Sequence, residues 1–259
     1  MVVSLTIDTE EDLHSKTYVS LNYGIPKILK ICDRFEIKLT FFVPAMLLEK
    51  FPVLFKDLRN KGHEIALHGY EHERFDELSF NEKEKRIIKS ILVYREIFNE
   101  NPKGFRAPQH SIDNETLGLL SKYGFSYDSS YTPFNLLQLL FFPKKIKLFI
   151  EGFFKPRKIF FIKKNLYEIP VSGFLIAFVS LPLRIFPKPI LRLYLSILKL
   201  TNKDLVFYAH SWDFIKLPNS RIDKIFSHKK LMKNLELMIK YLVKKNKFLT
   251  MEQIANENS

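Results

Sequence analysis

Short apolar runs alternate with amphipathic segments along most of this chain, and this alternation constrains the fold more than any other feature. The runs that favour strands end in polar or charged residues, and the segments between them repeat their apolar residues at helical spacing. Strands separated by helices pair in parallel, so the pattern predicts an α/β sheet or barrel. The chain has 259 residues, 46% of them hydrophobic, which is enough for a substantial core.

The expected strands are Val2–Asp8, Lys38–Val43, Glu64–His68, Gly104–Ala107, Phe125–Tyr127, Leu166–Val171, Leu205–Ala209 and Phe248–Thr250. The expected helices are Ile25–Phe35, Pro44–Asn60, a helix from the capping box at Ser79 through Phe98, Asn114–Tyr123 and His228–Asn246. Two segments rich in Phe, Leu, Pro, Lys and Arg break the alternation, Phe134–Lys164 and Phe174–Leu200. We therefore predict one domain over residues 1–259, with a basic, aromatic-rich insertion at about 134–200.

The formal net charge is +13 and the sequence pI is near 9.6, so the chain should attract polyanions or an anionic membrane surface. Its basic runs are interleaved with Phe and Leu and match no nucleic-acid motif, so no nucleic-acid partner is expected. The single cysteine, Cys32, cannot form an intrachain disulfide. No signal-peptide pattern and no membrane-length apolar segment is visible. We expect a cytoplasmic protein, with peripheral attachment at the inner membrane face as an alternative.

Chemistry-bearing residues follow two of the expected strands. His68 and His72 follow the run Glu64–Leu67, and the acidic cluster Asp8–Asp12 follows the first strand. The carboxyl ends of parallel strands meet at one edge of the sheet, where α/β proteins place their ligands. Two imidazoles and a carboxylate can hold a divalent metal and leave coordination positions open for water, as catalytic metal sites do. The pattern predicts a metal-dependent hydrolase.

Within the acidic cluster, residues two apart in a strand point the same way, so Asp8 and Glu10 can face one cleft. One carboxylate could then bind the metal while the other accepts a proton from water. Glu11 or Asp12, at the start of the following loop, could replace Glu10 as the ligand.

Three further polar clusters follow short apolar runs: Arg106-Ala107-Pro108, Tyr127-Asp128-Ser129-Ser130 and His210-Ser211-Trp212-Asp213. Taken alone, Arg106 is more typical of a surface or salt-bridging arginine, and His210 fits a core position as well as a functional one. Together with Thr6–Glu10 and His68–His72, they form an ordered series of five motifs.

This series resembles the five motifs of the NodB-type polysaccharide deacetylases, which form carbohydrate esterase family four and its relatives. The resemblance covers about Val2–Ile254, apart from the basic aromatic segments. It implies a distorted (β/α)7 barrel and a metal site of two histidines and one acid, commonly occupied by zinc. Mapped onto this chain, it implies Glu10, His68 and His72 as metal ligands.

The resemblance also implies roles for the remaining motif residues. Asp8 takes the place of the catalytic base, and Arg106 that of the arginine that holds it. His210 resembles the catalytic acid, and Asp128 the carboxylate that orients this histidine. The backbone amide of Gln109 can donate to an oxyanion.

Two departures from the family pattern stand out. The first motif usually has adjacent aspartates, whereas here the acids are spaced as Asp8 and Glu10. The third motif usually continues with an aromatic residue and glycine, whereas Gln109 and His110 follow Pro108 here, which changes the sugar-facing pocket.

The implied activity is removal of an N-acyl group, in the first place N-acetyl, from an aminosugar of a glycan or of a nucleotide-linked or lipid-linked precursor. One alternative keeps the site and changes the substrate, as in amidohydrolases that act on cyclic ureides and deformylases that act on lipid-linked aminosugars. A second alternative is a non-catalytic carbohydrate- or lipid-binding protein with the same fold.

Overall fold

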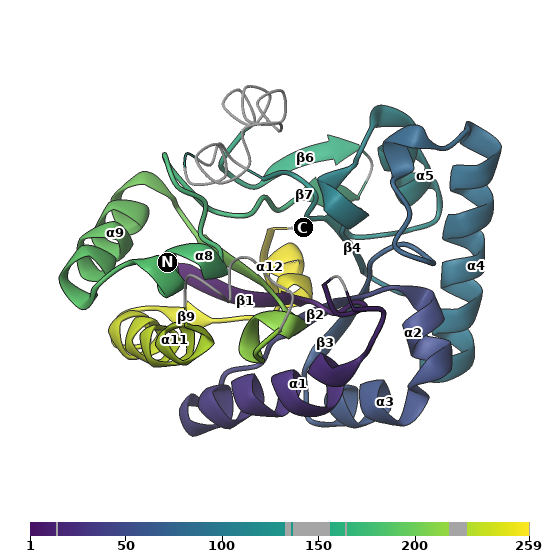
Figure 1. Ribbon diagram of the computed structural model, residues 1–259. Helices are drawn as coiled ribbons and strands as arrows, with labels where there is room; N and C mark the ends of the chain where they lie inside the picture. The colour runs from purple at the N-terminus through teal and green to yellow at the C-terminus, as the bar shows by residue number, and fades with distance from the viewer. Residues whose placement is uncertain (14, 133–135, 137–155, 164, 218–226, 259) are drawn as a thin grey trace.

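The computed structural model describes residues 1–13, 15–132, 136, 156–163, 165–217 and 227–258, and shows a curved sheet surrounded by helices (Figure 1). The strands are β1 (Val2–Asp8), β2 (Thr40–Val43), β3 (Glu64–Leu67), β4 (Gly104–Phe105), β5 (Tyr127–Asp128), β6 (Phe160–Lys163), β7 (Leu166–Glu168), β8 (Leu205–His210) and β9 (Lys247–Phe248).

The α-helices are α1 (Val19–Cys32), α2 (Ala45–Lys50), α3 (Pro52–Asn60), α4 (Phe80–Phe98), α5 (Asn114–Lys122), α8 (Ser180–Ile185), α9 (Lys188–Thr201), α11 (His228–Leu242) and α12 (Met251–Asn258). Short 3-10 turns are η1 (Asp33–Phe35), η2 (Phe75–Glu77), η3 (Pro108–His110) and η5 (Ser211–Phe214). Among the helices in the described ranges, none combines the length and the apolarity needed to cross a bilayer.

The sheet follows the order β7-β5-β4-β3-β2-β1-β8, and every neighbouring pair along this path is parallel. β6 is antiparallel to β7 at one edge, and β9 pairs with the start of β1. The segment after β7 connects the two ends of this path, because it is hydrogen-bonded to β8. The Ser172 amide donates to the Val206 carbonyl at 3.1 Å, and the Tyr208 amide donates to the Phe178 carbonyl at 3.0 Å. The expected distorted barrel of parallel strands is confirmed.

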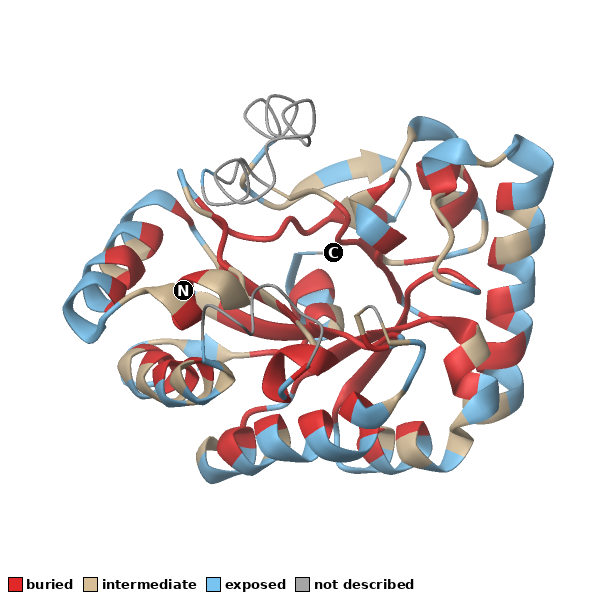
Figure 2. Cartoon of the chain, viewed as in Figure 1, coloured by how far each residue is buried: buried red, intermediate tan, exposed pale blue. Residues whose placement is uncertain are grey.

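The core lies between the sheet and the helices around it, as the buried residues in Figure 2 show. Val3, Leu5 and Ile7 of β1 are fully buried, and so are Ile25 and Ile28 of α1. A helix that buries one stripe of apolar residues against a parallel sheet is the packing that the alternating sequence requires.

Two helices differ from the sequence-based expectation for identifiable reasons. The helix expected over Pro44–Asn60 is two helices, α2 and α3, because Pro52 has no amide hydrogen to continue the first one and instead begins the second. Helix α1 begins at Val19, earlier than expected, because the Asp12 carboxylate accepts from the amides of Val19 at 2.6 Å and Ser20 at 3.1 Å. A cap supplied from outside the helix leaves no local sequence signal.

The region expected to form the insertion contains two elements of the main fold, since β7 lies in the parallel path and α9 precedes β8. Most of Phe134–Lys164 lies outside the described residues. An insertion at about 134–200 therefore stays a prediction.

Candidate functional site

Glu10, His68 and His72 come together at the carboxyl ends of β1 and β3. One ligand atom from each lies within 4.8 Å of the other two. Glu10 Oε2 contacts His72 Nε2 directly, and the two imidazole rings are 5.2 Å apart between centroids. Two imidazole nitrogens and one carboxylate oxygen form a donor set that fits a divalent metal such as zinc.

The imidazole of His68 is oriented by a second contact. Its Nδ1 atom is 2.7 Å from the Arg106 carbonyl oxygen, which leaves Nε2 facing the cluster. Carbonyl partners of this kind fix the tautomer of metal-binding histidines. Burial, followed by the charge of His72, lowers the pKa of His68 to about 3, so this imidazole is neutral at pH 7, as a metal ligand must be.

The loop that carries His72 reverses direction after β3, because two of its residues have positive φ angles. Gly69 has a φ of +74°, and a Cβ atom at this position would meet side-chain atoms of Phe75 and Pro108 at 3.2 Å. The Glu73 carboxylate accepts from the Tyr70 amide at 3.1 Å and holds this turn from its other end. His72 itself has a φ of +68°, so the loop returns His72 toward Glu10.

The geometry separates the two candidate acidic ligands. Asp12 is buried, and its carboxylate binds the Thr17 hydroxyl at 2.8 Å in addition to the amides at the start of α1. Glu11 is exposed. Only Glu10 of the acidic cluster joins the two histidines in the group described above.

Asp8 and Arg106 form a buried ion pair beside this group. Arg106 Nη1 lies 2.8 Å from Asp8 Oδ1, and the exposed fractions of the two side chains are 0% and 3%. The guanidinium also donates to the Thr6 hydroxyl at 3.0 Å and to the carbonyl and hydroxyl of Ser129, each at 2.9 Å. It lies 4.0 Å from the centre of the Phe42 ring. The other carboxylate oxygen, Asp8 Oδ2, is 3.5 Å from His68 Nε2.

His210 enters the site from the neighbouring strand, because Asp8 and His210 are partners in the β1–β8 register. Its Nε2 atom is 2.7 Å from the Tyr208 hydroxyl and 3.4 Å from Glu10 Oε1. The ring stacks on Trp212 with a centroid distance of 4.1 Å and an interplanar angle of 12°. The sheet register therefore places His210 and Asp8 together beside the Glu10–His68–His72 group.

The carboxylate against His210 is Asp213, which corrects the assignment of Asp128 to this position. Asp213 Oδ2 accepts from the His210 amide at 3.0 Å and lies 3.8 Å from Nδ1. Arg184 of α8 donates to Asp213 Oδ1 at 3.1 Å and to its carbonyl at 2.9 Å.

The pKa values of this pair move in opposite directions. Burial alone would lower the pKa of His210, but its hydrogen bond to Asp213 and the charges of Glu10, Asp213 and Asp8 raise it overall. Burial would raise the pKa of Asp213, but its hydrogen bond to His210 and the charge of Arg184 bring it to about 2. An ionised Asp213 thus favours a protonated His210.

Asp128 has different neighbours. Its carboxylate accepts from the Ser130 hydroxyl at 2.7 Å, and that hydroxyl accepts from the Ala107 amide at 2.8 Å. Asp128 also pairs with Glu168 in the β5–β7 register, and its pKa is raised by burial. Its contacts run to Ser130 and, through that hydroxyl, to the turn that carries Arg106, whereas Asp213 takes the position beside His210.

Sequence reasoning did not assign three residues that contact His210 or its carboxylate partner: Tyr208, Asp213 and Arg184. Tyr208 precedes His210 by two positions on β8, so strand alternation could have indicated that both face the site. Asp213 lies three residues after His210 inside a motif that had been singled out. Arg184 lies in a basic, apolar segment and carries no comparable local signal.

Gln109 lies in the short turn η3, has a φ of +54° and is exposed. The neighbouring His110 contacts the Ser130 carbonyl through Nδ1 at 3.0 Å and packs edge-on against Tyr208 at 5.3 Å. His110 thus lines the side of the site where the family pattern has a different residue. The oxyanion role of the Gln109 amide stays a prediction.

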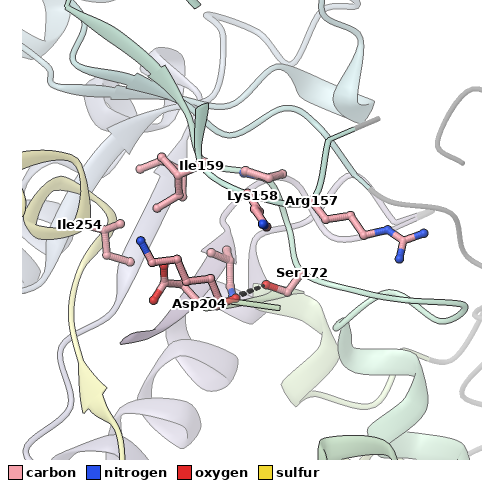
Figure 3. Close-up of a pocket in the computed structure, with 10 residues that line it drawn as sticks. Arg157, Lys158, Ile159, Ser172, Asp204 and Ile254 are labelled. Carbon is pink, nitrogen blue, oxygen red and sulfur yellow. Dashed lines mark hydrogen bonds between the residues drawn. The ribbon is translucent and has the colours of Figure 1, made fainter. Parts of the chain in front are cut away.

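A separate hollow lies at the opposite end of the sheet, where Asp204 precedes β8 and accepts from the Val2 amide at 3.0 Å. Figure 3 shows Arg157, Lys158, Ile159 and Ile254 around it, with the Ser172 hydroxyl donating to the Asp204 carbonyl at 3.0 Å. Its volume is about 10 Å³, which is room for roughly one water molecule and none for a sugar.

Comparison with known proteins gives two family matches. A model described as "Polysaccharide deacetylase" matches residues 1–127, and a "Domain of unknown function (DUF3473)" matches residues 151–256. A peptidoglycan deacetylase from Helicobacter pylori is 31% identical over 132 residues, 49% of this chain and 45% of the relative. The peptidoglycan deacetylase-like protein FGM2 from Gibberella zeae is 40% identical over 109 residues, 41% of this chain and 32% of the relative. The chain thus spans less than half the length of these curated relatives.

Solved structures share the fold over almost the whole chain. A protein from Mycobacterium smegmatis described as a polysaccharide deacetylase superposes with a TM-score of 0.70 at 20% identity, covering 99% of this chain and 89% of that one. Puue allantoinase superposes with a TM-score of 0.67 at 16% identity, covering 98% and 89%. Residues 1–127 thus match the polysaccharide deacetylase family, and the chain as a whole shares its fold with solved proteins described as polysaccharide deacetylases.

Proposed function

We propose that this protein is a metal-dependent hydrolase that removes an N-acyl group, in the first place N-acetyl, from an aminosugar of a glycan or glycan precursor. The observation that carries the proposal is the meeting of Asp8, held by Arg106, and His210 around the Glu10–His68–His72 group. Because β1 and β8 both contribute, we also propose that residues 1–259 act as one catalytic unit.

The residues divide the reaction between them. A divalent cation, expected to be zinc, would be held by Glu10, His68 and His72 and would supply Lewis acidity for the attacking water and the acyl oxygen. Asp8 accepts the proton of the attacking water, with Arg106 compensating the charge of its carboxylate. The Gln109 amide donates to the oxyanion, a contribution commonly worth ~3 kcal/mol per donor.

His210 protonates the departing amine, because an amide anion cannot leave unaided. Its raised pKa and the contact with Asp213 suit a proton donor near neutral pH. The stacked Trp212 ring restricts the imidazole to one orientation.

The names of the relatives support an aminosugar polymer such as peptidoglycan as the substrate class. The expected cytoplasmic location favours instead a nucleotide-linked or lipid-linked aminosugar. An amidohydrolase acting on a cyclic ureide, or a deformylase, would use the same residues, and an allantoinase has the same fold. A non-catalytic binding protein is less favoured, since it would need neither the Asp8–Arg106 pair nor His210.

Zinc-loaded protein should be incubated with N-acetylglucosamine oligomers, nucleotide-linked N-acetylhexosamine, a lipid-linked N-formyl aminosugar and a cyclic ureide. Free acetate supports a deacetylase, whereas formate or a ureido acid supports one of the rival enzymes. Glu10→Gln should abolish product formation, and the matched control Glu11→Gln, at an exposed neighbour, should not. If the fully metallated protein forms no product from any of these substrates, the hypothesis of a non-catalytic binding protein is the one that remains.

A further inference from the structure

Helix α9 exposes apolar side chains on the face that points away from the barrel. Leu191, Tyr194, Leu195 and Leu198 are buried against the fold. A second stripe remains exposed, with fractions of 48% for Ile190, 61% for Leu193, 38% for Ile197 and 86% for Leu200. Their spacing of three and four residues puts them on one side of the helix. A surface helix of a water-exposed domain would carry polar residues there.

A turn bonded to α9 also exposes two apolar side chains. Phe174 and Leu175 are 37% and 48% exposed and lie at the tip of a turn closed by the Gly173–Ala177 bridge. This turn is tied to α9, because the Tyr194 hydroxyl donates to the Ala177 carbonyl at 2.8 Å. We call Phe174, Leu175, Ile190, Leu193, Ile197 and Leu200 the outer α9 surface; α9 stands at the periphery of the fold in Figures 1 and 2.

The charges that α9 and the segment before it carry are of one sign. Lys188, Arg192 and Lys199 follow one flank of α9 at helical spacing, and the exposed Lys203 follows its end. The Arg157 guanidinium lies 5.1 Å from the centre of the Phe174 ring. The sequence contains no Asp or Glu from 169 to 203. A second copy of this chain would bring like charges together across such an interface.

We propose that the outer α9 surface docks the protein on an anionic lipid bilayer, with the apolar stripe at the headgroup boundary and the basic flank on lipid phosphates. Helices with one apolar face and Lys or Arg beside it lie in the membrane interface without crossing it. A bilayer with anionic lipid supplies both the apolar and the negative partner that this surface lacks. The proposal does not depend on the catalytic activity.

The test is cosedimentation of the full-length protein with phosphatidylcholine vesicles that contain or lack phosphatidylglycerol, at low and high salt. Binding should require the anionic lipid and should weaken as salt screens the charges. Arg192→Glu with Lys199→Glu should weaken binding about 25-fold or more, since each basic residue contributes roughly fivefold. Leu193→Ser with Leu200→Ser should weaken it on the order of tenfold per side chain.

The matched control is Leu92→Ser with Lys85→Glu, an apolar and a basic substitution at exposed positions of α4, which should bind as wild type. Circular dichroism should show that all variants are folded, because none of the changed side chains is buried. No binding to anionic vesicles at low salt, equal binding to neutral vesicles, or equal losses in the α4 control would overturn the proposal. So would a dimer in solution that Leu193→Ser with Leu200→Ser dissociates, because a second copy would then cover this surface.

Discussion

Replacing Arg106 with methionine tests the buried ion pair at the centre of the site. Methionine retains much of the apolar stem, but it leaves the buried Asp8 carboxylate without its cation and the Ser129 carbonyl without its donor. Removing one partner of a buried pair costs ~3–5 kcal/mol because the other charge stays uncompensated. Small proteins have a total unfolding free energy of roughly 5–15 kcal/mol, so the variant should fold with a large part of its stability lost. Urea unfolding at pH 7 with a chelator present, followed by circular dichroism, measures this loss without a contribution from metal.

Two controls give this measurement its meaning. In an Asp8→Asn background the buried charge is absent, so Arg106→Met should cost about 2 kcal/mol less than in the wild type. Arg34→Met removes an arginine whose partner is Glu236 and whose side chain is 51% exposed, and it should cost no more than about 1 kcal/mol. If Arg106→Met costs no more than Arg34→Met, or costs the same with and without the Asp8 charge, the buried-pair reasoning is refuted.

Three further predictions follow from the site and the core. The protein should bind one divalent ion per chain, and by elemental analysis His68→Ala should lose it and Asp12→Asn should keep it. Retention in His68→Ala would refute the site, and loss in Asp12→Asn would shift the third ligand from Glu10 to Asp12. Asp8→Asn and His210→Ala should stay folded but reduce turnover on the order of 10²–10⁴-fold, and near-wild-type rates in both would rule out the acid–base scheme. Burial raises the pKa of Glu64 from 4.5 to about 7, so between these pH values the folded state keeps a proton that the unfolded state loses. The unfolding free energy should therefore fall by ~3 kcal/mol as pH rises from 4.5 past 7. Glu64→Gln should remove this pH dependence in urea unfolding, and an unchanged dependence would contradict the prediction.

Strand positions and the ends that carry chemistry could be predicted from the sequence because they depend on local patterns. Val2–Asp8 is a strand as expected, and His68 lies at the carboxyl end of β3, directly after Leu67. The start of α1 could not be predicted, because its amides are capped by Asp12 from outside the helix. Contacts of this kind depend on the fold and not on neighbouring residues.

The candidate site shows the same division. Glu10 and His72 could be paired from motif spacing, because each follows a strand that ends at the same edge. The carboxylate on His210 could not be assigned from motif order, since Asp128 ends one strand and Asp213 follows another. The choice depends on the turn η5, where Asp213 binds back to the His210 amide, and on a buried arginine from a helix that no motif includes.

The pairing of Asp8 with His210 across β1 and β8 has a consequence for dividing the chain. A fragment ending near residue 127 would retain Asp8 and His68 but would have no His210, and the long edge of β1 that β8 covers would be open. Exposed edges of this kind recruit other strands, so such a fragment should aggregate. Supplied together as separate polypeptides, the two pieces would regain the site only by rebuilding the β1–β8 ladder. Recovered turnover would then report strand complementation directly.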